Sequence, residues 1–259
     1  MSEATEHRTS APAAPGVARA AIWGAVGLAG IVALAQGAWA AAFCVAASMA
    51  LAAGPRAFTA FSGLRFPAGL STGVLLYTAA ALLLGELGGL YVTTAWFDVV
   101  LHLIAAAVLA QVGWAIVLML TDGGRPSVAL WIGAVLAFAF SMMVGALWEV
   151  LEFGIDLTFG TNTQRSGIPD TMTDLIADAA GAAYGAWAVQ RRLARGTAVP
   201  GGGLVVEWMR LNSLVYACWP AWSAAIEERR GRRLAAEDRA LQRRGQAGVD
   251  VVAGEDRVR

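Results

Sequence analysis

Residues 127–148 read SVALWIGAVLAFAFSMMVGALW, and this stretch decides the fold class. It contains no charged side chain, and a helix needs about 20 consecutive apolar residues to cross the hydrocarbon core of a bilayer. The stretch therefore predicts a transmembrane helix. The whole chain agrees, because 58% of its 259 residues are apolar and only 15% are charged, which excludes an ordinary soluble domain.

Five other stretches have a similar character. The first two, Ala20–Gln36 and Ala38–Ala53, are predicted to form a helical hairpin that turns at Gln36 and Gly37. We expect the first helix to be uncleaved, although residues 38–40 read AWA and imitate a signal-peptide site. The others are Ala68–Leu84, Val99–Leu120 and Asp174–Gln190, the last of which is the weakest because it contains two aspartates. The predicted fold is all-α, a polytopic bundle of about six spans within residues 20–190.

The arginines predict the orientation of this bundle. Arginine is the only strongly basic residue type in the chain, since lysine is absent. With six spans, one side receives all the arginines of the membrane part except Arg165; these are Arg8, Arg19, Arg56, Arg65, Arg125, Arg191, Arg192 and Arg195. Positively charged loops remain in the cytoplasm. We therefore expect a bacterial inner-membrane protein with residues 1–19 and the C-terminus in the cytoplasm.

The charge is distributed unevenly along the chain. Residues 1–190 carry a net charge of −5, and residues 191–259 carry +5. Within this basic tail, residues 204–226 suit a helix on the inner leaflet, residues 227–244 suit a solvated helix, and the last residues suit disorder. The tail could bind anionic lipid headgroups or serve only as a positive-inside anchor. We expect membrane lipids as partners and no nucleic acid, and the sequence predicts no protein partner.

Acidic residues gather at one end of three predicted spans. Asp98 and His102 open the fourth span, and a second group closes the fifth; its members are Glu149, Glu152 and Asp156. The sixth span opens with a stripe of aspartates that continues into two glycines; its members are Asp170, Asp174, Asp178, Gly181 and Gly185. A small-xxx-small seam allows close helix packing, and ionisable groups inside a membrane indicate a functional site by default.

Some residues of this group also have a purely structural interpretation. Asp98 and Asp170 suit N-terminal capping of their helices, and a single His102 suits packing. A structural role explains Glu149 and Glu152 less well, because a carboxylate near a helix C-terminus interacts unfavourably with the helix dipole. Arg165 is the only basic residue on that side and cannot neutralise seven carboxylates. Two explanations stay open, which are shared protons and a bound divalent ion.

The two cysteines, Cys44 and Cys218, do not indicate a disulfide framework or a thiolate zinc site. A metal site would therefore use oxygen and imidazole ligands, which suit Zn²⁺, Mn²⁺ or Mg²⁺. The predicted ligands are His102, Glu149, Glu152 and Asp174. The predicted general base or supporting residues are Asp98, Asp170 and Asp178, and Arg165 is the predicted contact for an anionic substrate group.

Four motifs resemble those of YjdF-type bacterial inner-membrane proteins, in matching order between residues 75 and 190. Residues 96–102, WFDVVLH, resemble a D-x-x-x-H helix start, and residues 148–153, WEVLEF, resemble an aromatic-E-x-x-E-aromatic motif. Residues 160–164, GTNTQ, resemble a G-T-Q loop, and residues 170–175, DTMTDL, resemble a D-T-x-x-D-M segment. A looser pattern is similar to VanZ-like proteins, but Asp178 replaces their usual asparagine. The resemblance implies a helical bundle with an acidic outer site and implies no reaction.

Three functions stay open. The first is a metal-dependent membrane enzyme that acts on a lipid or envelope substrate at the outer leaflet. The second is a proton- or cation-coupled transporter, which would need a polar path through the inner half of the spans, where no charged residue lies. The third is a non-catalytic membrane protein in which the polar cluster only locks the helices together.

Overall fold

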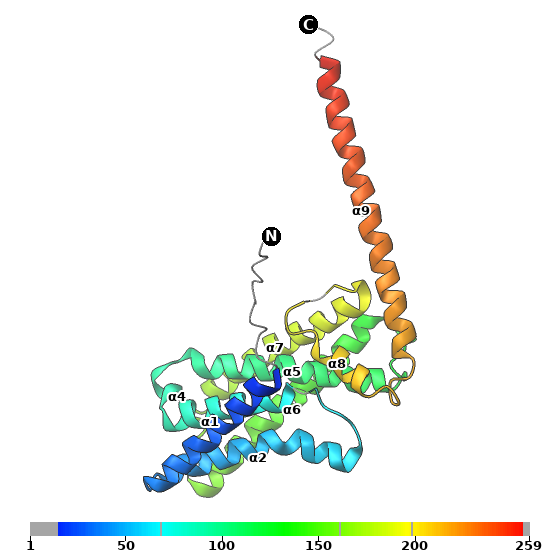
Figure 1. Cartoon of the computed structure of the whole chain (residues 1–259). Helices are drawn as coiled ribbons and strands as arrows, with labels where there is room; N and C mark the ends of the chain where they lie inside the picture. The colour runs from blue at the N-terminus through cyan, green and yellow to red at the C-terminus, as the bar shows by residue number, and fades with distance from the viewer. Residues whose placement is uncertain (1–14, 68, 161, 198, 256–259) are drawn as a thin grey trace, which may run out of the picture. The chain divides into compact units, whose positions relative to one another are not determined.

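The computed structural model describes residues 15–67, 69–160, 162–197 and 199–255, and all regular structure in them is helical (Figure 1). The helices are α1 (Pro15–Ala35), α2 (Trp39–Ser62), α3 (Leu70–Ala79), η1 (Ala80–Leu87), α4 (Leu90–Thr93), α5 (Trp96–Met119), α6 (Leu130–Phe159), α7 (Ile168–Arg195), α8 (Leu204–Leu211) and α9 (Trp219–Glu255). The all-α fold class is confirmed. Most of the predicted cytoplasmic N-terminal segment and the last four residues lie outside the described residues.

Five helical stretches in the described part of the chain are long and apolar enough to cross a membrane. They are Gly16–Ala35, Trp39–Ser62, Leu70–Leu87, Trp96–Met119 and Leu130–Phe159. These coincide with the first five predicted spans, and they make the chain a membrane-embedded protein. The sixth predicted span lies within α7, which is not among the five. Its aspartates and glycines face other helices in place of lipid, so composition alone does not mark it, and its crossing of the membrane stays a prediction.

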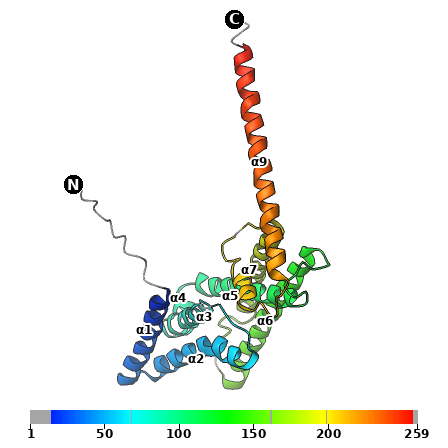
Figure 2. The same cartoon turned by 45° about the vertical axis from the view of Figure 1, so that its right-hand side comes forward.

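The chain divides into two compact units, residues 1–101 and residues 102–259, with α5 continuing from one into the other. In the first unit, α1 and α2 form the predicted hairpin (Figures 1 and 2). Gly37 makes the turn with φ of 69°, a conformation that glycine adopts without steric cost. Helix α3 packs on α2 and continues into η1, a π-helical segment.

The second unit is built on close contacts among α5, α6 and α7. A Cβ atom on Gly181 would collide with the backbone carbonyl of Leu103, and one on Gly185 would collide with that of Ala107. A Cβ atom on Gly113 of α5 would lie 2.8 Å from the Cα of Ala137 on α6. Small residues therefore bring the three backbones together, as the Gly181 and Gly185 seam predicted for α7.

Hydrogen bonds across these helices strengthen the same contacts. The Ser141 hydroxyl on α6 donates to the Ala106 carbonyl on α5 over 2.9 Å. The Trp114 indole on α5 donates to the Ala186 carbonyl on α7 over 2.9 Å, and Trp114 is fully buried. Bonds of this kind fix the register between neighbouring helices, because no water is present in a bilayer core to replace them.

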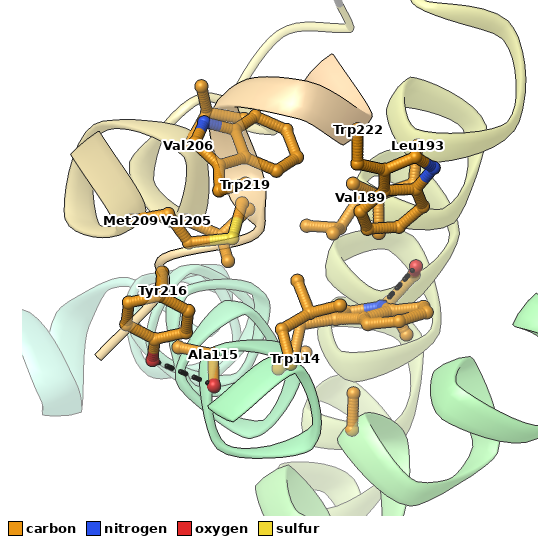
Figure 3. Packing of buried hydrophobic residues seen from close by; sticks show 14 of the residues in the cluster. Trp114, Ala115, Val189, Leu193, Val205, Val206, Met209, Tyr216, Trp219 and Trp222 are labelled. Carbon is orange, nitrogen blue, oxygen red and sulfur yellow. Dashed lines mark hydrogen bonds between the residues drawn. The ribbon is translucent and has the colours of Figure 1, made fainter. Parts of the chain in front are cut away.

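The C-terminal part differs from the predicted single interfacial helix over residues 204–226. Helix α8 ends at Leu211, and α9 begins only at Trp219 after a turn. Aromatic and aliphatic side chains from both helices and from the turn between them are buried against α5 and α7, as Figure 3 shows for Met209, Tyr216, Trp219 and Trp222. The Tyr216 hydroxyl donates to the Ala115 carbonyl over 2.9 Å. This segment is therefore part of the core of the second unit.

Beyond Ile226, α9 becomes a charged helix, as predicted for residues 227–244. Ion pairs one turn apart line it, with Arg232 and Glu228 2.8 Å apart and Arg230 and Glu227 3.3 Å apart. Such exposed pairs contribute about 0.3–0.5 kcal/mol each. The helix continues to Glu255, farther than the predicted solvated helix.

Candidate functional site: a buried histidine between carboxylates

His102 lies between two aspartates of α7. Its Nδ1 atom is 3.2 Å from Oδ1 of Asp178, and its Nε2 atom is 4.0 Å from Oδ2 of Asp174. The two aspartates are one helical turn apart, so they present their carboxylates on the same face. The His102 side chain is 11% exposed, and those of Asp174 and Asp178 are 4% and 3% exposed. The three groups therefore interact away from solvent.

Asp98 joins this cluster from the preceding turn of α5. One carboxylate oxygen each from Asp98 and Asp174 and one ring nitrogen of His102 lie within 4.8 Å of one another. The four-residue spacing of Asp98 and His102 places them on one face of the helix, as predicted. Ligand atoms at about 2.1 Å from a metal ion can be at most about 4.2 Å apart. The group is thus slightly wider than a closed coordination shell, and binding an ion would require these side chains to move closer together.

Glu149 on α6 is the most unusual member of the cluster. The residue is 5% exposed, and neither of its carboxylate oxygens has a hydrogen bond of good geometry among the described residues. The Thr171 hydroxyl is its nearest hydrogen-bonding group, and His102 and Asp178 interact with the carboxylate electrostatically. Oδ2 of Asp178 is also buried without a partner. A carboxylate buried in this way is strongly destabilised unless a proton or a cation compensates it.

Glu149 does not lie near a helix C-terminus, as the sequence had led us to expect. Helix α6 continues to Phe159, so Glu149 lies about three turns before its end. The helix dipole acts mainly within the last turn, and it does not explain why Glu149 would need a partner. Burial explains it instead.

A glycine on α6 makes room for Asp178. A Cβ atom on Gly145 would collide with Oδ2 of Asp178, and its next contact would be the carboxyl carbon at 2.9 Å. Gly145 itself is buried and lies one turn before Glu149 on the same helix. Any larger residue at this position would displace the carboxylate that contacts His102. Gly145 was not among the predicted site residues, although it lies four residues before Glu149 and therefore on the same face of the helix.

A loop after α6 is fastened beside the cluster by Asp156. The Thr163 amide and hydroxyl each donate to Oδ1 of Asp156 over 2.7 Å, and the Gln164 amide donates to Oδ2 over 2.9 Å. The Gln164 side-chain amide then donates to the Thr171 hydroxyl over 2.9 Å and to the Glu149 carbonyl over 3.5 Å. The loop thus links the ends of α6 and α7, and Asp156 holds it in place.

Gln164 and Thr171 were not among the predicted site residues. Both lie within the motifs that carry the family resemblance, namely residues 160–164 and 170–175. The motifs therefore contain these two residues, but neither side chain is ionisable, and the predicted site consisted of ionisable residues alone.

Three predicted site residues lie at the margin of the cluster. Glu152 accepts a hydrogen bond from the Trp148 indole over 2.9 Å and is not part of the Asp98, His102 and Asp174 group. Arg165 is half-buried in the loop, where its charge attracts the Asp170 carboxylate in the first turn of α7. The structure thus brings together His102, Asp174, Asp178, Glu149 and Asp98, and it places Asp170 and Arg165 near each other.

The described arrangement offers one imidazole and several carboxylates in a buried setting. Asp178 at Nδ1 can fix the tautomer of His102 and direct Nε2 toward Asp174 and Asp98. A carboxylate at the second nitrogen of a histidine is the usual support for a metal-binding imidazole. The same geometry also suits an imidazolium between two carboxylates.

The comparisons with known proteins agree with this architecture. The family model described as "Predicted membrane protein (DUF2238)" matches residues 16–195, which include α1 to α7 and every member of the cluster. No curated protein and no solved structure matches the chain. The resemblance to YjdF-type proteins is confirmed, since that type is this family. The chain therefore belongs to the DUF2238 family of predicted membrane proteins.

Proposed function

We propose that this protein is a membrane-embedded metal-dependent enzyme in which His102, Asp174, Asp98 and Glu149 hold one divalent ion. The observation that supports this proposal most strongly is the Glu149 carboxylate, which is buried without a hydrogen bond of good geometry at either oxygen and has only the Thr171 hydroxyl near it as a neutral donor. A divalent cation beside His102 and Asp174 would compensate that charge and use the remaining acceptor atoms.

The roles of the residues follow from their contacts. His102 would bind through Nε2, because Nδ1 faces Asp178 over 3.2 Å. Asp178 would orient the ring from outside the coordination shell. A ligand set of one imidazole and several carboxylates suits Zn²⁺ or Mn²⁺, and Mg²⁺ would need more oxygen ligands and water.

The reaction class follows from the ion and the location. A bound divalent ion lowers the pKa of a coordinated water and polarises a phosphoryl or carbonyl oxygen. Under the predicted topology the cluster lies toward the outer leaflet, where lipid and envelope substrates are available. Arg165, held by the loop that Asp156 fastens, would bind an anionic group of the substrate.

One other function is favoured by a specific observation. His102 has a carboxylate at each ring nitrogen, and a protonated imidazole would satisfy both without a metal ion. The cluster would then be structural and lock α5 to α7. This alternative requires Glu149 to carry a proton and requires no substrate.

The metal content of the detergent-purified protein tests the proposal. We expect about one divalent ion per chain in the wild type, and loss of that ion in His102→Ala and Asp174→Asn. Glu149→Gln keeps the shape of the side chain, removes its charge and should also lose the ion. Asp238→Asn on the exposed part of α9 is the matched control and should keep it.

A folded wild type that binds no divalent ion after dialysis against Zn²⁺, Mn²⁺ and Mg²⁺ would contradict the metal site and support the structural alternative. Ion retention in all three variants would contradict the ligand assignment. If the ion is present, hydrolysis of phospholipid and envelope-lipid substrates is the next assay, with the metal-free protein as the blank.

A further inference from the structure

A second polar feature lies at the other end of α7, away from the histidine cluster. A pocket of about 190 Å³ is formed there by the end of α7, by α8 and by the first turns of α9. All three elements belong to the second compact unit. The pocket shares no lining residue with the histidine cluster, and the sequence analysis singled out none of its residues as a site.

Two arginines from different helices line this pocket. Arg192 comes from the last turn of α7, and Arg210 comes from the last turn of α8. Neither forms an ion pair or a side-chain hydrogen bond with another described residue. Three arginines of α9 differ, because Arg230, Arg232 and Arg233 each face a glutamate. Two guanidinium groups facing one space can bind a phosphate with several charge-assisted hydrogen bonds.

A third arginine stands at the edge of the same pocket. A Cβ atom on Gly196, which lines the pocket, would lie 3.2 Å from Cδ of Arg230. Glu227 also lines the pocket and is the one carboxylate there, but Arg230 pairs with it over 3.3 Å. The charged groups around the pocket therefore leave a positive excess, even with Glu227 counted.

Most of the remaining lining is apolar. Trp219, Val206 and Ile226 line the pocket and are buried, and Figure 3 shows Trp219 and Val206. The uncharged polar residue there is Ser223. A pocket with apolar walls and two arginines suits an amphipathic ligand that carries an anionic group. Its volume is below the roughly 300–1,000 Å³ of pockets that enclose whole drug-sized molecules. It would therefore hold a headgroup and leave longer chains outside.

The surroundings favour a lipid over a soluble anion. On α7, the Arg191 guanidinium lies over the Trp187 ring at 5.6 Å from its centroid, and Trp187 is 46% exposed. A tryptophan and an arginine side chain together on one helix face are typical of a membrane interface. Under the predicted topology this interface belongs to the inner leaflet, whose anionic lipids attract basic segments.

We propose that the Arg192 and Arg210 pocket binds the phosphate of an anionic phospholipid headgroup. A basic tail is attracted to an anionic membrane in general, and this site would add one specific lipid contact. The bound headgroup would also connect α8 and α9 to the end of α7.

The test uses the full-length protein in detergent, titrated with phosphatidylglycerol, phosphatidylcholine or inorganic phosphate and followed by native mass spectrometry. We expect one bound phosphatidylglycerol, about tenfold tighter than phosphatidylcholine. Both lipids carry the phosphate, but the cationic choline of phosphatidylcholine would be repelled by the arginines around the pocket. The double variant Arg192→Gln/Arg210→Gln should lose this preference. The control Arg239→Gln/Arg243→Gln removes the same charge from exposed positions of α9 and should keep it.

A second variant separates the pocket from general electrostatics. Ala224→Trp places a large side chain at the pocket without changing the charge, and it should also lose the preference. Equal losses in the two double variants, or full binding by Ala224→Trp, would overturn the proposal. Complete competition by inorganic phosphate at equal concentration would overturn the assignment to a lipid. The metal content of all these variants should equal that of the wild type, so the result is independent of the metal site.

Discussion

The two ends of α7 carry opposite charges, and these charged side chains differ in how deeply they are buried. At the first end, Asp174 and Asp178 are 3% and 2% exposed and face a histidine and a glutamate. At the last end, Arg191 and Arg192 are half-buried and Arg195 is exposed. Short aspartates can be enclosed because Gly181 and Gly185 let α7 approach α5. Arginines have long stems that carry the charge to the surface. One helix therefore holds a buried centre and a surface-accessible pocket.

The largest expected effect comes from breaking the approach of α7 to α5. Gly181→Leu forces a side chain against the Leu103 carbonyl, and such overpacking costs about 3 kcal/mol or more. We expect a large drop in the thermal unfolding midpoint of the purified protein.

Gly154→Leu is the matched control for this change. A Cβ atom on Gly154 of α6 would meet nothing within 4 Å, and replacing a helical glycine can even stabilise the helix by up to about 1 kcal/mol. An equal loss of stability in both variants would contradict the close packing that encloses the acidic end.

The second-largest effect is expected from removing the charge of Asp178, and it tests whether this residue supports His102. Asp178→Asn keeps the shape of the side chain but weakens its hold on Nδ1 of His102. Loss of such a supporting carboxylate lowers metal affinity by about 10–100-fold. We expect the titration of the metal-free protein to show that reduction, and Asp238→Asn to show none. Complete loss of the ion would make Asp178 a direct ligand instead.

A smaller effect is expected from a change near the C-terminal end of α7, where Arg192 lies. Tyr216→Phe removes a buried hydroxyl that accepts from the Trp208 indole and donates to the Ala115 carbonyl, each over 2.9 Å (Figure 3 shows the latter). Leaving these groups unpaired costs about 1–2 kcal/mol. Tyr184→Phe is the control, because that hydroxyl also donates to a carbonyl but Tyr184 is 41% exposed. Chemical unfolding should separate the two variants.

The smallest expected change in global stability follows Asp156→Ala. This substitution removes the acceptor of three hydrogen bonds from Thr163 and Gln164. We expect the loop amides to exchange hydrogen about tenfold faster or more, with little change in the midpoint of unfolding, because loops open locally. Unchanged exchange at Thr163 and Gln164 would show that Asp156 does not hold the loop beside the buried centre.

The sequence predicted the fold class and the first five spans because length and hydropathy are local properties of a chain. The bend at Gly37 and the seam at Gly181 and Gly185 were also readable, since small residues at fixed spacing have a direct steric meaning. The sequence likewise selected His102, Asp174 and Asp178, because ionisable residues within apolar stretches are rare.

Only the tertiary structure decided how those residues meet. Asp178 faces Nδ1 of His102 because α7 approaches α5 over two glycines and because Gly145 of α6 leaves room for the carboxylate. The pocket lined by Arg192 and Arg210 also depends on three helices that come together, α7, α8 and α9. The end of α6 has a local signal instead, because Gly160 follows Phe159 in the left-handed conformation with φ of 64°. Distances of a few ångströms between helices are set by packing, and periodicity within one helix carries no information about them.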